Sequence, residues 1–340
     1  MLRRSVGFIL VLILTVRSWT VVNVVSAQID PNLPIIVSDL DWSPDGSLIA
    51  IGLSAYGTGA ICILDPNIQL WNVASQQVTY IPRIGEICSV TNVDFISDGS
   101  RLLVTSDSDV QIWNINSGDR LQALLTTTRF QHAYWNPDGT KFLDVDKSGI
   151  DILNPSDISE TYLTLIAPKR LENVFFTDSV WSPDGKRIAS STDDGTIYVW
   201  DAANEDILQT FTAHTAAVQH LVWNVKTDLI ASGDDQGVIV IWNPETGETV
   251  AELDGHTDAV RDLDWRSDGQ QIASAGADNT LRIWDWPSGD MPIVEDHESI
   301  WSLAYSPDGS QLAYGGEFPD SSNVSIRLID TSLAVDLGSS

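Results

Sequence analysis

The pentapeptide Trp42-Ser-Pro-Asp-Gly46 decides the fold, because related copies of it recur along the whole chain. It is repeated unchanged at Trp181–Gly185, close variants follow at four further places, and a degenerate copy begins at Trp223. The first residues of the seven copies are Trp42, Phe95, Trp135, Trp181, Trp223, Trp265 and Tyr305, which lie 53, 40, 46, 42, 42 and 40 residues apart. A period near 40 residues indicates a repeat architecture rather than one continuous core.

Each copy carries a second anchor, an apolar residue followed by Asn or Asp. It lies 18 or 19 residues after the first anchor in the five middle copies, 29 in the first copy and 24 in the last. The second anchors are Trp71, Trp113, Leu153, Trp200, Trp242, Trp284 and Ile329. Ten of the 13 Trp residues therefore occupy one of two fixed positions in the repeat, and the first and last copies each contain an inserted loop.

Each copy also reads as four short strands. In the sixth copy these strands cover residues 259–265, 270–276, 281–286 and 291–295, and turn residues separate them. Pro at the second turn position and Gly at the fourth fit a type I turn closed by a left-handed Gly. One such sheet cannot bury both of its faces, whereas sheets packed radially can. We therefore predict an all-β fold.

This pattern resembles the WD-repeat family over residues 34 to about 338. The resemblance implies one seven-bladed β-propeller of four-stranded antiparallel blades over residues 28–340, in an exported, bacterial-type member. The blades are expected at 34–83, 84–125, 126–167, 168–212, 213–254, 255–295 and 296–338. The resemblance is specific for the fold and says little about function.

In the family, a His, a Ser or Thr, an Asp and a Trp form a hydrogen-bonded network inside a blade. The sixth repeat supplies all four, as His256, Ser274, Asp278 and Trp284. The fifth supplies His214, Ser232 and Trp242, and its acidic residue is interpreted as displaced to Asp235. We interpret these residues as buried structural groups rather than catalytic ones, and expect the blades without the full set to be held by packing.

The N-terminus carries the pattern of an export signal. Arg3 and Arg4 precede an apolar run over residues 6–16, and residues 25–27 suit a signal peptidase. We therefore predict a signal peptide at 1–27, cleaved after Ala27, and a secreted, periplasmic or cell-envelope protein. Read on to Val25, the segment is long enough to span a bilayer, so an uncleaved membrane anchor is the alternative.

The outer strand of the seventh blade has two candidate sources. The C-terminal segment Ser332–Gly338 is one. In many relatives the N-terminal segment supplies this strand instead. Cleavage after Ala27 would leave residues 28–33 for that task, whereas an uncleaved chain offers the better strand Thr20–Val25.

The chain contains two Cys residues, Cys62 in the insertion of the first repeat and Cys88 between the first and second repeats. The resemblance places both loops on one face of the propeller, and disulfides persist in exported proteins. We therefore expect a Cys62–Cys88 disulfide. Two buried free thiols are the alternative.

The charge limits the classes of partner. The chain has 47 acidic and 18 basic residues, a net charge of -29, which disfavours nucleic acid and anionic membrane surfaces as partners. Asp is favoured in tight turns, which accounts for much of this acidity; a basic protein partner is the alternative explanation. Membrane contact is expected only through an uncleaved N-terminal segment. The chain shows no hydrolase nucleophile elbow, zinc-protease, P-loop or dinucleotide motif, so we predict no catalytic residue, metal or cofactor.

The family binds partners chiefly on the face that carries the starts of the innermost strands. In the repeat register, this face receives Trp301, Arg261, Gln219, Thr177 and Gln131, with Arg129 and Phe175 two residues earlier on the same rim. Trp301 lies outside both anchor positions, and Trp beside Arg is typical of an interface hot spot. The alternative is that Trp301 fills the central channel or packs on the inner strand.

We therefore predict a non-catalytic protein-binding scaffold whose partner is unknown. Two alternatives remain at this point. One is a propeller enzyme of the hydrolase or lactonase kind, which a cluster of Asp and His at the channel mouth would support. The other is a Tol-type periplasmic envelope component, whose propellers also repeat a Ser-Pro-Asp-Gly turn.

Overall fold

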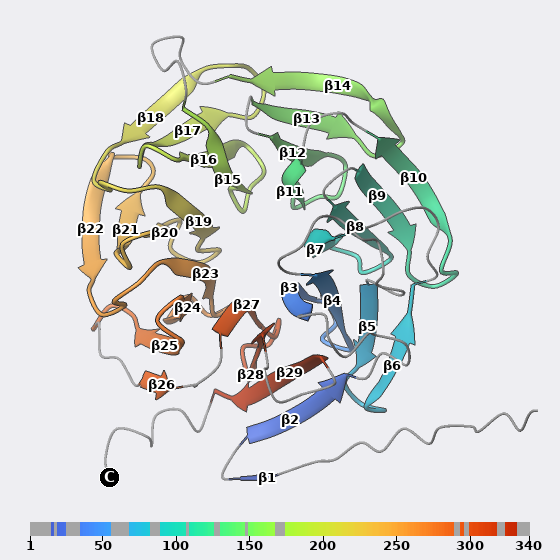
Figure 1. Ribbon diagram of the computed structural model, residues 1–340. Helices are drawn as coiled ribbons and strands as arrows, with labels where there is room; N and C mark the ends of the chain where they lie inside the picture. The colour runs from blue at the N-terminus through green and yellow to red at the C-terminus, as the bar shows by residue number, and fades with distance from the viewer. Residues whose placement is uncertain are drawn as a thin grey trace, which may run out of the picture.

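The computed structural model shows an all-β protein whose sheets stand side by side around a central axis (Figure 1). It describes residues 15–16, 19–24, 35–55, 68–81, 89–106, 109–125, 130–146, 149–166, 174–288, 293–295, 299–317 and 324–331. Within these residues the strands form seven antiparallel sheets. The predicted seven-bladed β-propeller is confirmed.

Six sheets are each built from four consecutive strands. The first three comprise β3 (Ile35–Trp42), β4 (Leu48–Ala55), β5 (Ile68–Asn72) and β6 (Gln77–Tyr80); β7 (Val90–Phe95), β8 (Arg101–Ser106), β9 (Asp109–Asn114) and β10 (Arg120–Leu125); and β11 (Phe130–Trp135), β12 (Phe142–Asp146), β13 (Ile150–Asn154) and β14 (Asp157–Leu165). The next three comprise β15 (Phe176–Trp181), β16 (Arg187–Thr192), β17 (Ile197–Asp201) and β18 (Ile207–Phe211); β19 (Val218–Trp223), β20 (Ile230–Asp234), β21 (Ile239–Asn243) and β22 (Glu248–Leu253); and β23 (Val260–Trp265), β24 (Gln271–Gly276), β25 (Thr280–Asp285) and β26 (Ile293–Glu295).

The seventh sheet joins the two ends of the chain. Its strand order is β27 (Ser299–Tyr305), β28 (Gln311–Glu317), β29 (Val324–Asp330), β2 (Trp19–Val24) and β1 (Thr15–Val16). β2 pairs antiparallel with β29 over six residues, from Trp19 opposite Ile329 to Val24 opposite Val324. Figure 1 shows β2 lying along the outer side of β29. Of the two candidate sources, the structure uses the N-terminal segment; residues 332–338 lie outside the described residues.

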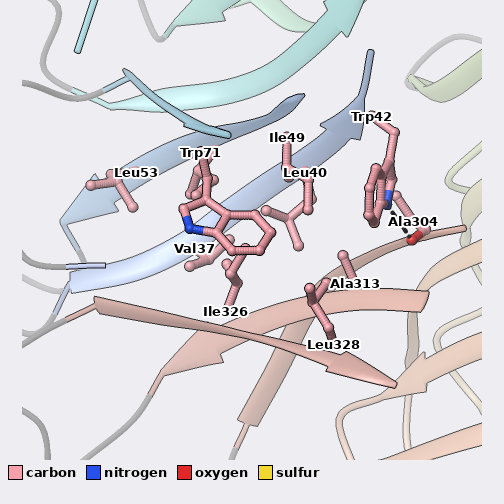
Figure 2. Packing of buried hydrophobic residues seen from close by; sticks show 11 residues of the cluster. Val37, Leu40, Trp42, Ile49, Leu53, Trp71, Ala304, Ala313, Ile326 and Leu328 are labelled. Atoms are coloured by element: carbon pink, nitrogen blue, oxygen red, sulfur yellow. Dashed lines mark hydrogen bonds between the residues drawn. The ribbon is translucent and has the colours of Figure 1, made fainter. Parts of the chain in front are cut away.

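The core is divided into layers between neighbouring blades. In the layer between the first and seventh sheets, the indole of Trp71 is 2% exposed, and the indole Nε1 of Trp42 donates to the carbonyl of Ala304 at 3.0 Å. Figure 2 shows these side chains filling the space between the two sheets; the labelled members are Val37, Leu40, Trp42, Ile49, Leu53, Trp71, Ala304, Ala313, Ile326 and Leu328. Truncating a Trp buried in this way costs about 3–5 kcal/mol, which explains why the repeat keeps aromatic anchors.

The repeated pentapeptide forms the turn between the first two strands of a blade. In the first copy, the amide of Gly46 donates to the carbonyl of Ser43 at 2.8 Å, and Gly46 has φ +70. The Asp45 carboxylate accepts hydrogen bonds from the Ser43 hydroxyl at 2.7 Å and from the Ser47 amide at 3.0 Å. These contacts account for Ser, Asp and Gly in the turn, because a left-handed φ strains any residue with a Cβ.

The sixth blade contains the expected network. His256 Nδ1 lies 3.0 Å from Asp278 Oδ1, His256 Nε2 lies 2.7 Å from the Ser274 hydroxyl, and Trp284 Nε1 donates to that hydroxyl at 2.9 Å. All four side chains lie inside the blade, and burial lowers the pKa of His256. Their predicted structural role agrees with these contacts.

The fifth blade corrects one assignment. Its acidic partner is Asp234, whose Oδ2 lies 2.8 Å from His214 Nδ1, while Ser232 accepts from Trp242 at 2.6 Å. Asp235 was the wrong residue because it lies in the turn after β20, whereas Asp234 is the last residue of that strand and shares the face of Ser232. Asp235 is exposed and lines the central cavity instead. The expected Cys62–Cys88 disulfide lies outside the described residues.

Candidate functional site

Each of the seven innermost strands contains one β-bulge, and every bulge lies at the same position of the repeat. The register of each inner strand slips by one residue four positions before its aromatic anchor. The bulged residues are Ser38, Thr91, Gln131, Thr177, Gln219, Arg261 and Trp301. A bulge redirects a side chain and is common beside functional sites. We call these seven residues the mouth ring.

The mouth ring surrounds the entrance to a central channel. One cavity of about 640 Å³ extends along the inner strands, and a second of about 320 Å³ adjoins it. Both cavities are lined by Ser38, Thr91, His132, Gln219 and Trp301. Because the bulges precede the anchors, they lie at the strand ends opposite the Pro-Asp-Gly turns. The mouth is therefore a concave surface of the kind that proteins use for binding.

Arg261 and Trp301 form the most distinctive pair of the mouth ring. The guanidinium carbon of Arg261 lies 3.9 Å from the ring centroid of Trp301, within cation–π range, and Nη1 donates to the carbonyl of Ile300 at 3.2 Å. Trp301 is half-buried and lines both cavities. The predicted neighbourhood of Trp301 and Arg261 is therefore present, with one face of the Trp already covered by Arg.

The other residues expected on this face are placed to different degrees. Gln219 lines both cavities, and Thr177 lines the smaller one, where its hydroxyl donates to the carbonyl of Val218. Phe175 precedes β15 and its side chain is 41% exposed. For Gln131 only the position in β11 is described, and Arg129 lies outside the described residues.

One residue deeper, each inner strand carries a second polar position. We call these seven residues the polar girdle: Asp39, Asn92, His132, Asp178, His220, Asp262 and Ser302. In five blades the girdle side chain accepts the backbone N–H of the next blade's inner strand. The donors are Val93 to Asp39 at 2.7 Å, Ala133 to Asn92 at 3.3 Å, Leu221 to Asp178 at 2.8 Å, Leu303 to Asp262 at 2.7 Å and Leu40 to Ser302 at 3.0 Å.

The two girdle histidines break this rule. Between the third and fourth blades, the Tyr134 hydroxyl donates to Asp178 at 3.0 Å, and His132 stacks on Tyr134 with ring centroids 6.0 Å apart. Between the fifth and sixth blades, His220 Nε2 lies 3.3 Å from Asp262 Oδ1, and His220 Nδ1 lies 3.7 Å from Asp178 Oδ2. All seven blade junctions are therefore bridged at the level of the girdle.

Burial controls the charges in the channel. It raises the pKa of Asp39 and of Asp264 to about 7 and that of Asp41 to about 8. Burial also raises the pKa of Asp94 and of Asp262. At His220 burial opposes the cation, but the carboxylates of Asp262, Asp178 and Asp39 outweigh it and raise the imidazole pKa. The empty channel therefore carries less charge near neutral pH than its carboxyl groups would carry in water.

Three channel carboxylates accept hydrogen bonds that join neighbouring blades. Asp41, Asp94 and Asp264 each accept the backbone N–H of the next blade's anchor, from Phe95, Trp135 and Tyr305. Within the described residues no group of three or more His, Cys, Asp or Glu could hold a metal ion. No Ser or Thr hydroxyl in that part of the chain hydrogen-bonds His220.

The sequence interpretation missed Ser38 and Thr91, although they occupy the register of Trp301. Their small side chains drew no attention, yet counting four residues back from Trp42 and Phe95 identifies them. The polar girdle was missed as well. Its signal was available, since the third residue before every anchor is polar.

Comparison with known proteins agrees with the repeat pattern. The family described as WD domain, G-beta repeat (WD40) matches residues 83–114, 247–285 and 291–322. The Anaphase-promoting complex subunit 4 WD40 domain matches residues 167–226. Together with the architecture above, these matches support a WD-repeat propeller.

Several curated proteins are similar over about half of this chain. Anaphase-promoting complex subunit cdh1 of Dictyostelium discoideum is 28% identical over 48% of this chain and 20% of its own length. Protein tipD of the same organism is 30% identical over 44% and 25%. Cell division cycle 20.5, cofactor of APC complex, of Arabidopsis thaliana is 28% identical over 54% and 39%. The chain thus matches two-fifths or less of each relative.

Solved structures share the fold over most of the chain. A chain in the crystal structure of the Mitotic Checkpoint Complex is 23% identical, with a TM-score of 0.73, covering 97% of this chain and 98% of its own. The β-propeller domain of Cps50 (Swd1) from Myceliophteria thermophila is 15% identical, with a TM-score of 0.74, covering 88% and 99%. At these identities the likeness describes the fold alone.

Proposed function

We propose that this WD-repeat β-propeller is a non-catalytic scaffold that binds protein partners at the mouth ring. The observation that carries the proposal is the Arg261–Trp301 pair, which stands at the rim of the channel on two neighbouring bulges. Trp and Arg dominate the binding energy of many protein interfaces. The bulges fix both side chains on rigid strands, so little conformational freedom is lost on binding.

The named relatives support a role in assemblies. Two of the similar proteins are named as a subunit or a cofactor of the anaphase-promoting complex, which is a function exercised together with other proteins. This chain matches only part of each relative, so the partner is not carried over. The acidity of the chain supports a basic partner, because complementary charge steers association.

The proposal is tested by affinity capture with the tagged protein and mass spectrometry, alongside Trp301→Ala. Tyr162→Ala is the matched control, because Tyr162 on β14 is an exposed aromatic that pairs with the cation of Lys141 at 4.7 Å, but on the outer rim. We expect a partner that wild type and Tyr162→Ala capture and Trp301→Ala loses. A partner captured equally by all three would place the binding surface elsewhere.

A channel hydrolase is the second candidate, and one observation favours it. His220 lies between the carboxylates of Asp178 and Asp262, inside a cavity large enough for a small substrate. A panel of ester and lactone substrates tests it, with His220→Gln as the comparison. Turnover by the wild type that His220→Gln abolishes would favour the hydrolase over the scaffold.

We also propose export from the cytoplasm, on the N-terminal pattern alone. Within the described residues, no helix is long and apolar enough to cross a membrane. A chain cut after Ala27 would lose β2, so the pairing of β2 with β29 supports the uncleaved form of the segment. Cell fractionation and the mass of the isolated protein test both points. A cytoplasmic protein would contradict export, and a mass starting at Gln28 would contradict retention.

A further inference from the structure

The junction between the fifth and sixth blades differs from its neighbours in what holds it at the level of the girdle. Elsewhere a side-chain acceptor receives a backbone N–H, or a tyrosine hydroxyl donates to a carboxylate. Here His220 occupies the acceptor position, and the amide of Leu263, which would be its donor, turns to its own Asp262 Oδ1 at 2.7 Å. The bridge that remains is the pair between His220 and Asp262.

A second bridge found at three other junctions is missing here. Asp41, Asp94 and Asp264 bridge their blades two residues after the girdle, whereas the fifth blade carries Val222 at that position. Val222 packs against the apolar layer between the fifth and sixth blades. The fourth and seventh blades carry Val180 and Ala304 at that position, but their junctions keep a backbone N–H donated to Asp178 and to Ser302. Among the described strands, the junction between the fifth and sixth blades lacks both kinds of bridge, so its inner end depends on the pair between His220 and Asp262.

The charge state of His220 decides how well that bridge is made. Its two ring nitrogens face two carboxylates, Asp262 at 3.3 Å and Asp178 at 3.7 Å. An imidazolium presents a proton to each, whereas a neutral imidazole turns one bare lone pair toward a carboxylate. Loss of the proton thus replaces an attraction by a repulsion at one of the two contacts.

The groups around His220 come from four other inner strands. Asp178 lies on β15, Asp262 and Asp264 on β23, Asp39 on β3, and His132 on β11. Arg261 lines the same cavity, but its guanidinium is engaged by Trp301. The carboxyl groups favour the imidazolium, while His132 opposes it.

We propose that the junction between the fifth and sixth blades is a proton-dependent seam, closed while His220 is charged and loosened when it is neutral. Gln219 and Arg261 of the mouth ring directly precede His220 and Asp262, so the seam also sets the spacing of these two mouth residues. The inference concerns the ring itself and holds with or without the proposed partner. It makes His220 a positioning residue for the mouth.

The first test is the titration of His220 by NMR of the histidine-labelled protein. We expect a midpoint above the ordinary value of about 6.5, and Asp262→Asn should lower it by about one unit or more. Asp45→Asn changes an exposed carboxylate in a turn at the opposite end of a blade and should leave the midpoint unchanged. A midpoint at or below the ordinary value, or one that Asp262→Asn does not move, would overturn the proposal.

The second test measures hydrogen exchange of β19 and β23, with β9 and β10 of the second blade as internal reference. After correction for the intrinsic pH dependence, we expect protection of the seam peptides to fall at least ~10-fold across the His220 midpoint. His220→Gln should remove this step, and His132→Gln, at the other girdle histidine, should keep it. A step that survives His220→Gln, or no step in the wild type, would contradict the seam.

Discussion

His214 Nδ1 and Asp234 Oδ2 lie 2.8 Å apart inside the fifth blade, and Asp234 occupies the repeat position at which the sixth blade has Gly276. A Cβ built on Gly276 would lie 2.3 Å from His256 Nδ1 and 2.4 Å from Asp278 Oδ1, because the carboxylate of the sixth blade comes from Asp278, two residues later in the turn after β24. The two blades therefore share the contact between His and a carboxylate, but not the repeat position of the acidic residue.

The contact with His214 predicts different contributions to stability for the adjacent residues Asp234 and Asp235. Asp234 also accepts the amides of Gln236 and Val238, both at 2.9 Å. We expect Asp234→Ala to lower the free energy of unfolding by about 2–4 kcal/mol, because it leaves buried donors unpaired. Asp235→Ala, at the exposed neighbour, should stay within about 0.5 kcal/mol of wild type. Urea unfolding measures both, and equal losses would return the acidic role to Asp235.

Stability should fall from mildly acidic to alkaline pH. When folding raises the pKa of a group, that group stabilises the folded state at low pH. This stabilisation is lost as the pH rises through the pKa of the folded state. Four channel groups have a raised pKa in the folded protein. The pKa is about 7 for Asp39 and Asp264 and about 8 for Asp41, and that of His220 is raised as well. We expect the melting temperature to be roughly 5 °C or more higher at pH 6 than at pH 9.

The turn aspartates limit this trend on the acidic side. Hydrogen bonds lower the pKa of Asp45, so its contribution is lost as pH falls through the folded value. Calorimetry from pH 4 to 9 should therefore find maximal stability near about pH 5–6. A maximum above pH 8 would contradict the charge state assigned to the channel.

Closure of the ring by β2 predicts the effect of two truncations. Removing residues 2–27 deletes the strand that pairs with β29, and should lower the melting temperature by at least ~5 °C, because the outer edge of β29 is then exposed. Removing residues 2–14 keeps β2 and should leave the melting temperature unchanged. Equal stability of both truncated proteins would show that another segment, with Ser332–Gly338 the first candidate, closes the blade.

A basic partner predicts sensitivity to salt. The chain carries a net charge of -29, and screening shortens the reach of its field from about 10 Å at 0.1 M salt to about 3 Å at 1 M. The association rate of the captured partner should fall at least ~10-fold over this range, while its dissociation rate changes little. Surface plasmon resonance measures both rates. A salt-independent association rate would exclude charge steering.

The sequence predicted most of the fold because anchors at fixed spacing determine the register of every blade. The same register predicted that Gln219, Arg261 and Trp301 share the mouth, because residues at equal distances from their anchors lie at the same end of the inner strands. Asp234 was misassigned although the two-residue alternation of a strand selects it over Asp235. The contact between His220 and Asp262 could not be read from the chain, because it joins residues on different blades and depends on how those blades pack.

The most direct test of the scaffold proposal is the dissociation constant of the captured partner for wild type, Trp301→Ala, Arg261→Ala and the double variant. We expect each single substitution to weaken binding by about 10-fold or more, and the double variant to lose less than the sum of the two, since the side chains act as one stacked pair. Circular dichroism confirms that each variant is folded. Unchanged affinity in all three variants would contradict the assignment of the mouth ring as the binding surface.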